Sequence, residues 1–313
     1  MKRNAYTRGI SIALKVAIVS LAAFYIVRRF TASPQPERIL EELLHAFSSN
    51  PLVFFFVIFL MPLNWLLEGI KWKIITSHRV KISLGDAMKG VLAGLTIGTA
   101  TPNRIGEFAG RIFMIREGDR MELFLLSAVA SFCQVAVTVL AGLAGLFWFP
   151  GYGKIASELW GIPAFVLLLL LAPLWMRLLP AAWREKLQML KQFPARLFVR
   201  AFLLSAIRYI VYVFQFLLLL WLVAPLMSWP ETLAGITVSY LLVTVIPTFS
   251  FTEILVRGSV AGIVFSFLTA IPLMFDKAFS IAVLLWLINV AVPSLVGSVF
   301  VFRLKFFKTK SGK

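Results

Sequence analysis

Three charged side chains that could take part in ion binding lie in the short segment TATPNRIGEFAGR, within an otherwise apolar part of the chain. They are Arg104, Glu107 and Arg111. Glu107 and Arg111 are four residues apart, so on a helix they share one face and can form an ion pair. The pattern is compatible with a site for an anionic group and with a purely structural pair that fixes a turn.

The backbone around these charges is interrupted by Pro102 and Gly106. Exposed amide and carbonyl groups inside a membrane need water, protein or ligand as partners, so we expect this region to line a polar cavity. A helix starting near Ile105 would direct its positive N-terminal end into that cavity, next to Arg104. Together these features favour an anionic ligand.

A second segment, IPTFSFTEILVR, has a similar arrangement. Pro247 is followed by Glu253, and Arg257 lies four residues further on. The same functional interpretation applies, but the stretch TFSFT contains no glycine, so a structural ion pair stays equally open here.

Other charges also fall in apolar segments. Arg208 lies about two turns inside its segment, where snorkelling to the headgroups and lining of a cavity are both compatible with its position. Glu68 and Lys71 lie near the end of another apolar segment and are interpreted as an interfacial pair, with a functional role as the alternative. Arg208 is therefore kept as a candidate for substrate binding.

The composition predicts a polytopic membrane protein that is all α-helical. Of the 313 residues, 60% are hydrophobic and 14% are charged. The apolar residues form blocks of about 20, the length of a helix that crosses a hydrocarbon core. About six full spans are expected, at residues 9–27, 51–70, 123–149, 160–178, 201–224 and 278–301.

The net charge of +17 reflects basic residues that are unevenly distributed between the loops. Clusters alternate with basic-poor loops, as the positive-inside rule describes, which predicts a plasma (inner) membrane protein with both termini in the cytoplasm. The basic excess is therefore assigned to orientation and lipid headgroups, not to nucleic acid. The clusters lie near residues 2–8, 71–89, 116–120, 177–200 and 303–313.

Two broken segments, residues 90–115 and 231–270, are predicted to enter and leave the membrane on one side as re-entrant helix pairs. Their flanking charges place them on opposite sides of the membrane. Such an arrangement is typical of an inverted-topology repeat, with residues 1–150 and 151–313 as the two halves of a single integral membrane domain.

The sequence contains no residue pattern that indicates catalysis, a metal site or a bound cofactor. Cys133 is the only cysteine, and the two histidines, His45 and His78, are isolated. Neither a metal site nor a cofactor is expected, and no group of His, Asp or Cys suggests catalysis at the membrane surface. The sequence therefore predicts a protein that is not an enzyme.

The motif TPNRIGEFAGRIFMI resembles the flippase-like integral membrane family that includes the transmembrane region of lysylphosphatidylglycerol synthases. Pro102, Arg104, Gly106 and Glu107 match its first motif, and the second segment matches its Pro-containing, Glu-bearing motif. Asn103 departs from the family pattern, where glycine is usual. The length of the chain and the pattern of its predicted spans are similar to those of the family over almost the whole chain. The specific motif covers about ten residues.

The resemblance implies a role in moving or binding a membrane lipid with an anionic headgroup, either a phospholipid or a polyprenyl-phosphate-linked lipid. Synthesis of aminoacylated lipids in that family belongs to a separate soluble domain. Two alternatives stay open: an ion-coupled transporter of a small solute, with Glu107 and Glu253 as proton sites, and an accessory membrane subunit of a lipid-modifying enzyme. A homodimer and such an enzyme are both open as partners.

Overall fold

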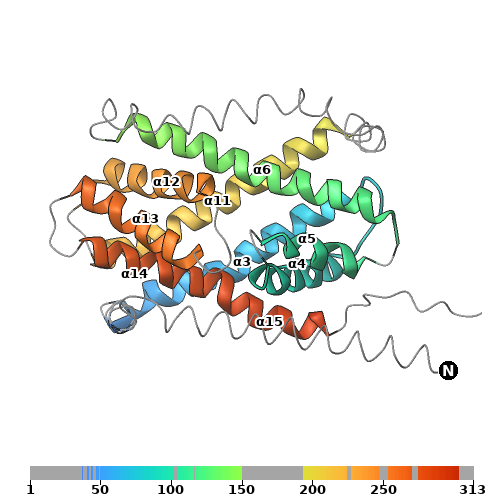
Figure 1. The fold of residues 1–313 in the computed structure, drawn as a ribbon, viewed down its shortest axis with the longest axis horizontal. Helices are drawn as coiled ribbons and strands as arrows, with labels where there is room; N and C mark the ends of the chain where they lie inside the picture. The colour runs from blue at the N-terminus through green and yellow to red at the C-terminus, as the bar shows by residue number, and fades with distance from the viewer. Residues whose placement is uncertain are drawn as a thin grey trace, which may run out of the picture.

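The structure, a computed structural model, describes residues 50–101, 104–115, 117–149, 193–223, 227–246, 253–269 and 274–302, with Glu37, Glu41, Leu44, Phe47 and Ser48. All regular secondary structure in these ranges is helical. Figure 1 shows long helices running along the molecule, with shorter helix pairs at their ends.

Four helices are long and apolar enough to cross a membrane, with a mean hydropathy of 2.0 to 2.2 in their most apolar windows. They coincide with four of the predicted spans. The predicted spans at 9–27 and 160–178 lie outside the described residues. The long elements are α3 (Pro51–Thr76), α6 (Arg120–Phe147), α11 (Ala195–Val223) and the continuous run of α14 (Met274–Trp286), the π-helical turn η3 (Leu287–Ala291) and α15 (Val292–Val301).

Polar caps fix where several helices begin. The Asn50 side chain accepts a hydrogen bond from the Val53 amide at the start of α3. Asp119 accepts from the amides of Met121 and Glu122 at the start of α6. These bonds satisfy amides that have no partner inside the helix, so α3 and α6 each have a defined start next to their apolar stretch.

Two pairs of shorter helices occupy the broken segments. The first pair is α4 (Leu84–Thr99) and α5 (Gly106–Met114), and the second is α12 (Trp229–Val245) and α13 (Glu253–Leu268). With 9 to 17 residues each, they span about 14 to 26 Å, less than the roughly 30 Å of a hydrocarbon core. Figure 1 places the two pairs at opposite ends of the long helices.

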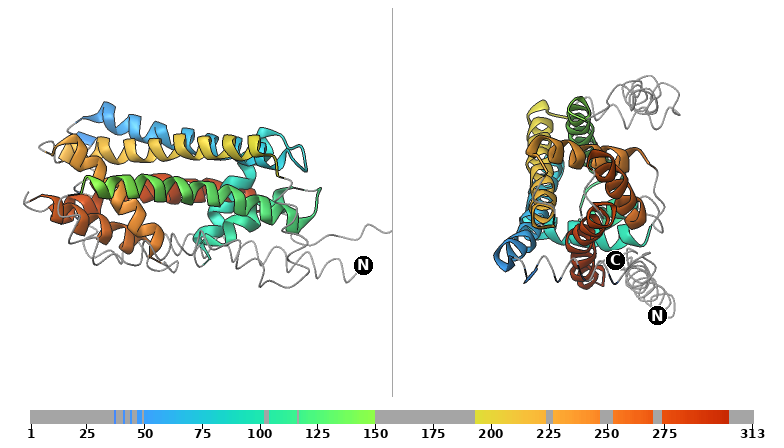
Figure 2. Two further views of the ribbon diagram at one scale, coloured as in Figure 1. Left: turned by 90° about the horizontal axis from the view of Figure 1, so that it is seen from above. Right: turned by 90° about the vertical axis from the view of Figure 1, so that its left-hand side faces the viewer.

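The order of elements is the same in both parts of the chain: a long helix, a short pair, and another long helix. In space the two parts pack against each other: α4 packs on α15, α12 packs on α6, and α3 packs on α11. Viewed from the end, the helices surround a central region (Figure 2). Each short pair is therefore held by the last long helix of the other part.

Glycine allows the first pair to pack backbone against backbone. A Cβ atom added to Gly110 would lie 2.2 Å from the Gly94 amide nitrogen, and one added to Gly297 on α15 would lie 2.0 Å from the Leu92 carbonyl oxygen. No larger residue fits at these positions without movement of the helices. Helices α4, α5 and α15 consequently form one closely packed unit.

We predict that Gly110→Ala separates α4 from α5 and destabilises the protein. The added methyl group meets backbone atoms, for which overpacking costs about 1 to 3 kcal/mol. Thermal unfolding in detergent should show a lower midpoint. Gly85→Ala is the matched control, because its new Cβ would lie 3.8 Å from Ser83 Oγ in otherwise open space. An equal midpoint for both variants would contradict the close packing.

Candidate functional site

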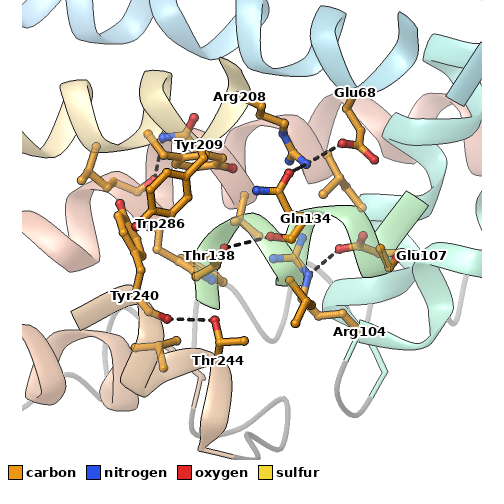
Figure 3. Close-up of a pocket in the computed structure, with 18 of the residues that line it drawn as sticks. Glu68, Arg104, Glu107, Gln134, Thr138, Arg208, Tyr209, Tyr240, Thr244 and Trp286 are labelled. Atoms are coloured by element: carbon orange, nitrogen blue, oxygen red, sulfur yellow. Dashed lines mark hydrogen bonds and ion pairs between the residues drawn. The ribbon is translucent and has the colours of Figure 1, made fainter. Parts of the chain in front are cut away.

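A cavity of about 430 Å³ lies between the helices, and residues from both short pairs and all the long helices except α15 line it. Figure 3 shows charged side chains on one side and Tyr209, Tyr240 and Trp286 on the other. Arg104 precedes α5 and also lines the cavity, so the first broken segment contributes directly to the wall.

Glu68 forms the centre of the charged side. Its carboxylate lies 2.8 Å from Lys71 Nζ, 2.9 Å from Arg111 Nη2 and 2.5 Å from Arg208 Nη1. The residue is 3% exposed and Lys71 is 1% exposed. The expected pair of Glu68 with Lys71 is confirmed, but its interfacial placement is wrong, because partners on α5 and α11 hold Glu68 in the interior.

A second group of ion pairs joins the two short helix pairs. Arg104 lies 2.5 Å from Glu107 and 3.5 Å from Glu253, at the start of α13. Glu253 also pairs with Arg257 at 3.1 Å, and Arg111 with Glu107 at 3.5 Å. The two predicted pairs at a spacing of four residues are confirmed, and Arg104 connects them.

The two groups together contain more cations than carboxylates. Lys71, Arg104, Arg111, Arg208 and Arg257 face three carboxylates, so the cluster carries an excess of two positive charges. Each carboxylate is already paired with at least two cations. Such an excess at low exposure is unfavourable unless an anion or water compensates it.

Some guanidinium atoms still have donor capacity. Within the described ranges, Nε and Nη1 of Arg111 and Nε of Arg208 are buried and make no hydrogen bond. Both residues line the cavity. Buried donors without partners are costly, so these atoms are suited to an anionic acceptor inside the cavity.

The structure brings most of the predicted site residues together. Arg104, Glu107, Arg111, Arg208 and Arg257 all line the cavity. Glu253 is not a lining residue, but it pairs with two that are, Arg104 and Arg257. For Arg208 this favours cavity lining over snorkelling.

Pro102, Gly106 and Pro247 are expected from the sequence to form the turns of the two broken segments, and of these the structure describes Gly106. Gly106 is the first residue of α5, with Ile105 before it as the N-cap, as expected. A Cβ on Gly106 would lie 2.5 Å from the Ile97 carbonyl oxygen, which explains the glycine. Pro102 and Pro247 lie outside the described residues.

Sequence reasoning missed a row of polar residues on α6. Ser127, Ser131, Gln134 and Thr138 all line the cavity. Their separations of four, three and four residues place them on one face of the helix, which is a signal that the sequence alone contains. Gln134 accepts a hydrogen bond from Arg208 Nη1 at 3.5 Å. The polar row on α6 is therefore in contact with the charged side of the cavity.

A buried cluster of three amides lies next to the cavity. Asn64 donates to Gln215 and to Asn289, at 3.4 and 3.3 Å, and Asn289 donates to Gln215 at 3.1 Å. The three residues come from α3, α11 and η3, so the cluster connects three elements at buried positions. Among the described residues, no three His, Cys, Asp or Glu side chains come together as a metal site.

The fold and the cavity define an integral membrane protein in which long apolar helices and two short helix pairs surround a charged interior. The chain belongs to the family described as the lysylphosphatidylglycerol synthase TM region, whose sequence profile matches residues 12–297. This confirms the resemblance and links the protein to membrane lipid biology. Comparisons with curated proteins and with solved structures give no match.

We predict that Glu68→Gln strongly destabilises the protein, because Lys71, Arg111 and Arg208 would remain buried without their shared carboxylate. Removing one partner of a buried ion cluster typically costs about 3 to 5 kcal/mol. Thermal unfolding in detergent measures the effect, and the double variant Glu68→Gln/Lys71→Met should recover part of it.

The matched control is Glu122→Gln. Glu122 pairs with Arg79 at 3.5 Å, with side chains 28% and 31% exposed. Such a pair contributes about 0 to 1 kcal/mol. If Glu68→Gln were no more harmful than Glu122→Gln, the central position of Glu68 would be refuted.

Proposed function

We propose that the protein moves an anionic lipid across the membrane, with the phosphate of a phospholipid or of a polyprenyl-phosphate-linked lipid in the cavity. The excess of two positive charges, with buried guanidinium atoms that have no partner among the described residues, is the observation that carries this proposal. The acyl chains stay in the bilayer, where they need no protein cavity.

The exposures of the charged side chains suggest a path for the headgroup. The side chains of Arg104, Glu107 and Arg257 are 22% to 29% exposed, whereas those of Glu68 and Arg111 are 4% and 7% exposed. The phosphate would first meet the partly exposed group and then Arg111 and Arg208 deeper inside. Glu107 and Glu253 hold the arginines in place before the anion arrives.

The contact between Arg104 and Glu253 provides a mechanism for opening. It joins the start of α13 to the turn before α5, and at 3.5 Å it is longer than the Arg104 pair with Glu107. In the proposed mechanism an entering phosphate replaces Glu253 as a partner of Arg104. The two short pairs then separate, and access alternates between the two sides of the membrane.

The same proposal includes an inverted-topology repeat with re-entrant short pairs in a bacterial inner membrane, and both termini in the cytoplasm. The repeated order of elements, the location of the two pairs at opposite ends, and helices too short to span the bilayer support it. Transport of this kind makes and breaks no covalent bond, so the proposed protein is not an enzyme.

Lipid movement can be tested in liposomes containing a fluorescent anionic phospholipid, by the fraction that a membrane-impermeant quencher reaches. Arg111→Gln should slow the movement about tenfold or more, because a hydrogen bond to a charged group contributes about 1.5 to 3 kcal/mol. Arg104→Ala should also slow it, since the entering phosphate loses a cation of the partly exposed group that it meets first.

Lys89→Gln is the control for charge removal. Lys89 pairs with Asp86 at 2.9 Å, with side chains 39% and 52% exposed, and is not a cavity residue. The Lys89→Gln variant should move the labelled lipid at the same rate as the unmodified protein. If the unmodified protein moves no anionic lipid, or if Arg111→Gln and Lys89→Gln behave alike, the proposed function is wrong.

The two short pairs should be accessible from opposite sides of the membrane. Ser83 and Ser228 immediately precede α4 and α12, and both are exposed. After replacement of the only cysteine by Cys133→Ala, an impermeant maleimide should label Ser228→Cys in intact cells. Ser83→Cys should react only after permeabilisation. Labelling of both from one side would contradict the inverted repeat.

A further inference from the structure

Among the described residues that line the cavity, Lys71 is the cation whose charge can change. The arginines stay protonated at any ordinary pH, because a guanidinium group does not release its proton in proteins. Each carboxylate of the charged cluster contacts at least two cations, which favours its ionised form. The cavity tyrosines are neutral near pH 7. A buried lysine amine, in contrast, exchanges its proton readily.

Two acceptors surround the Lys71 amine. Nζ donates to Ser205 Oγ on α11 at 3.2 Å and lies 2.8 Å from a carboxylate oxygen of Glu68. Lys71 is 1% exposed, and these two partners are 0% and 3% exposed. An ammonium group has three N–H donors and a neutral amine has two, so within the described ranges the third donor of a charged Lys71 has no acceptor. A ligand in the cavity is needed to supply it.

The charged groups that face Lys71 from the neighbouring helices are mainly cations. Arg111 on α5 and Arg208 on α11 share the Glu68 carboxylate with it. On α6, the buried thiol of Cys133 is near enough for an electrostatic interaction with Lys71. Helix α4 contributes apolar side chains to the cavity wall, and η3 contributes one neutral amide. Three cations therefore share one buried carboxylate, and release of a proton from Lys71 relieves their repulsion.

Binding of an anion and protonation of Lys71 compensate each other. With Lys71 charged, the cluster has an excess of two positive charges. With Lys71 neutral the excess is one, and it is also one when Lys71 is charged and a phosphodiester monoanion is bound. The interior therefore has the same net charge before and after binding, so neither state buries an additional charge.

We propose that Lys71 is a proton-binding site that couples lipid movement to a proton gradient. On the side where the phosphodiester enters, the lone pair of Lys71 Nζ takes a proton from water and forms an N–H bond. On the opposite side that bond breaks as the phosphate leaves, and the proton returns to water. One proton thus moves with each headgroup in the same direction. The inference rests on the proposed function and names its energy source.

Proton uptake can be measured when a lipid binds to the purified protein in weakly buffered detergent solution. The probe is phosphatidylglycerol, a phosphodiester that stays a monoanion over the range from about pH 6 to 9, within which many buried lysines titrate. A pH indicator should report uptake of up to about one proton per bound lipid. By linkage, the Kd should increase with pH by at most about tenfold per unit.

Two substitutions fix the charge at position 71 in opposite states. Lys71→Arg keeps the positive charge and releases no proton, so the lipid should bind at high pH as tightly as at low pH. Lys71→Met has no charge, so binding should be weak to the same extent across the range. Neither variant should take up protons. A folding defect would not give two pH-independent affinities that differ in this direction.

Two further variants serve as controls for the position of the proton site. Lys89 is exposed and pairs with Asp86 outside the cavity, so Lys89→Arg should keep the proton uptake and the pH dependence. Glu107→Gln should also keep the pH dependence, because its carboxylate is already paired with Arg104 and Arg111. Loss of the pH dependence in Glu107→Gln, with retention in Lys71→Arg, would overturn the assignment to Lys71.

Transport in liposomes tests the coupling itself. A proton and a phosphodiester together are neutral, so an imposed pH gradient should drive the labelled lipid towards the alkaline side, and an imposed membrane potential should not. In Lys71→Arg the lipid moves without a proton and carries net charge. Its movement should therefore respond to the potential and not to the pH gradient.

The outcomes separate this inference from the proposed function. Lipid movement that ignores the pH gradient, or equal pH dependence in the unmodified protein and both Lys71 variants, overturns the coupling and leaves translocation intact. Proton uptake on binding without any lipid movement refutes translocation and leaves Lys71 as the proton site. Absence of both binding and movement refutes both.

Discussion

The carboxylate of Glu68 is the contact on which the site depends. A carboxylate at 3% exposure is tolerated because three cations from α3, α5 and α11 surround it. Helix α5 has nine residues and no side-chain cap, so by itself it is a marginal helix. Its position follows from glycine packing on α4 and from the bond between Arg111 and Glu68. One buried group therefore positions a short helix, two long helices and the cavity wall.

The arrangement of Arg104 follows from the same constraint. Its φ of 57° lies in the left-handed region, which is unfavourable for a residue with a side chain. Two carboxylates, Glu107 and Glu253, lie within ion-pair distance of it and compensate this local strain. The strained residue thus lies where the two short pairs meet, and a conformational change there would alter both pairs at once.

Much of the fold could be predicted from the sequence, because apolar length and helix breakers are local signals. The described long helices and the start of α5 at Gly106 were expected, as were the ion pairs of Glu107 with Arg111 and of Glu253 with Arg257.

The role of Glu68 could not be predicted, since its partner Arg208 lies 140 residues away. A charge near the end of an apolar segment looks interfacial until the neighbouring helix is known. The polar row on α6 differs, because its spacing is visible in the sequence. It was missed because serine and threonine are common in buried helices, where they bond to their own backbone, as Thr138 does to the Gln134 carbonyl.

The two short pairs are held in different ways, and this bears on which contacts would change in the proposed transport. In the first pair, Gly94 and Gly110 bring two backbones together, and such contacts have no side chain that can adjust. In the second, Gly258 and Gly262 face the rings of Phe279 and Phe275 on α14. Rings can rotate and slide while staying packed, so α13 has more freedom on α14 than α5 has on α4. The proposed opening therefore involves movement of α13 away from Arg104, while α4, α5 and α15 stay fixed around Glu68.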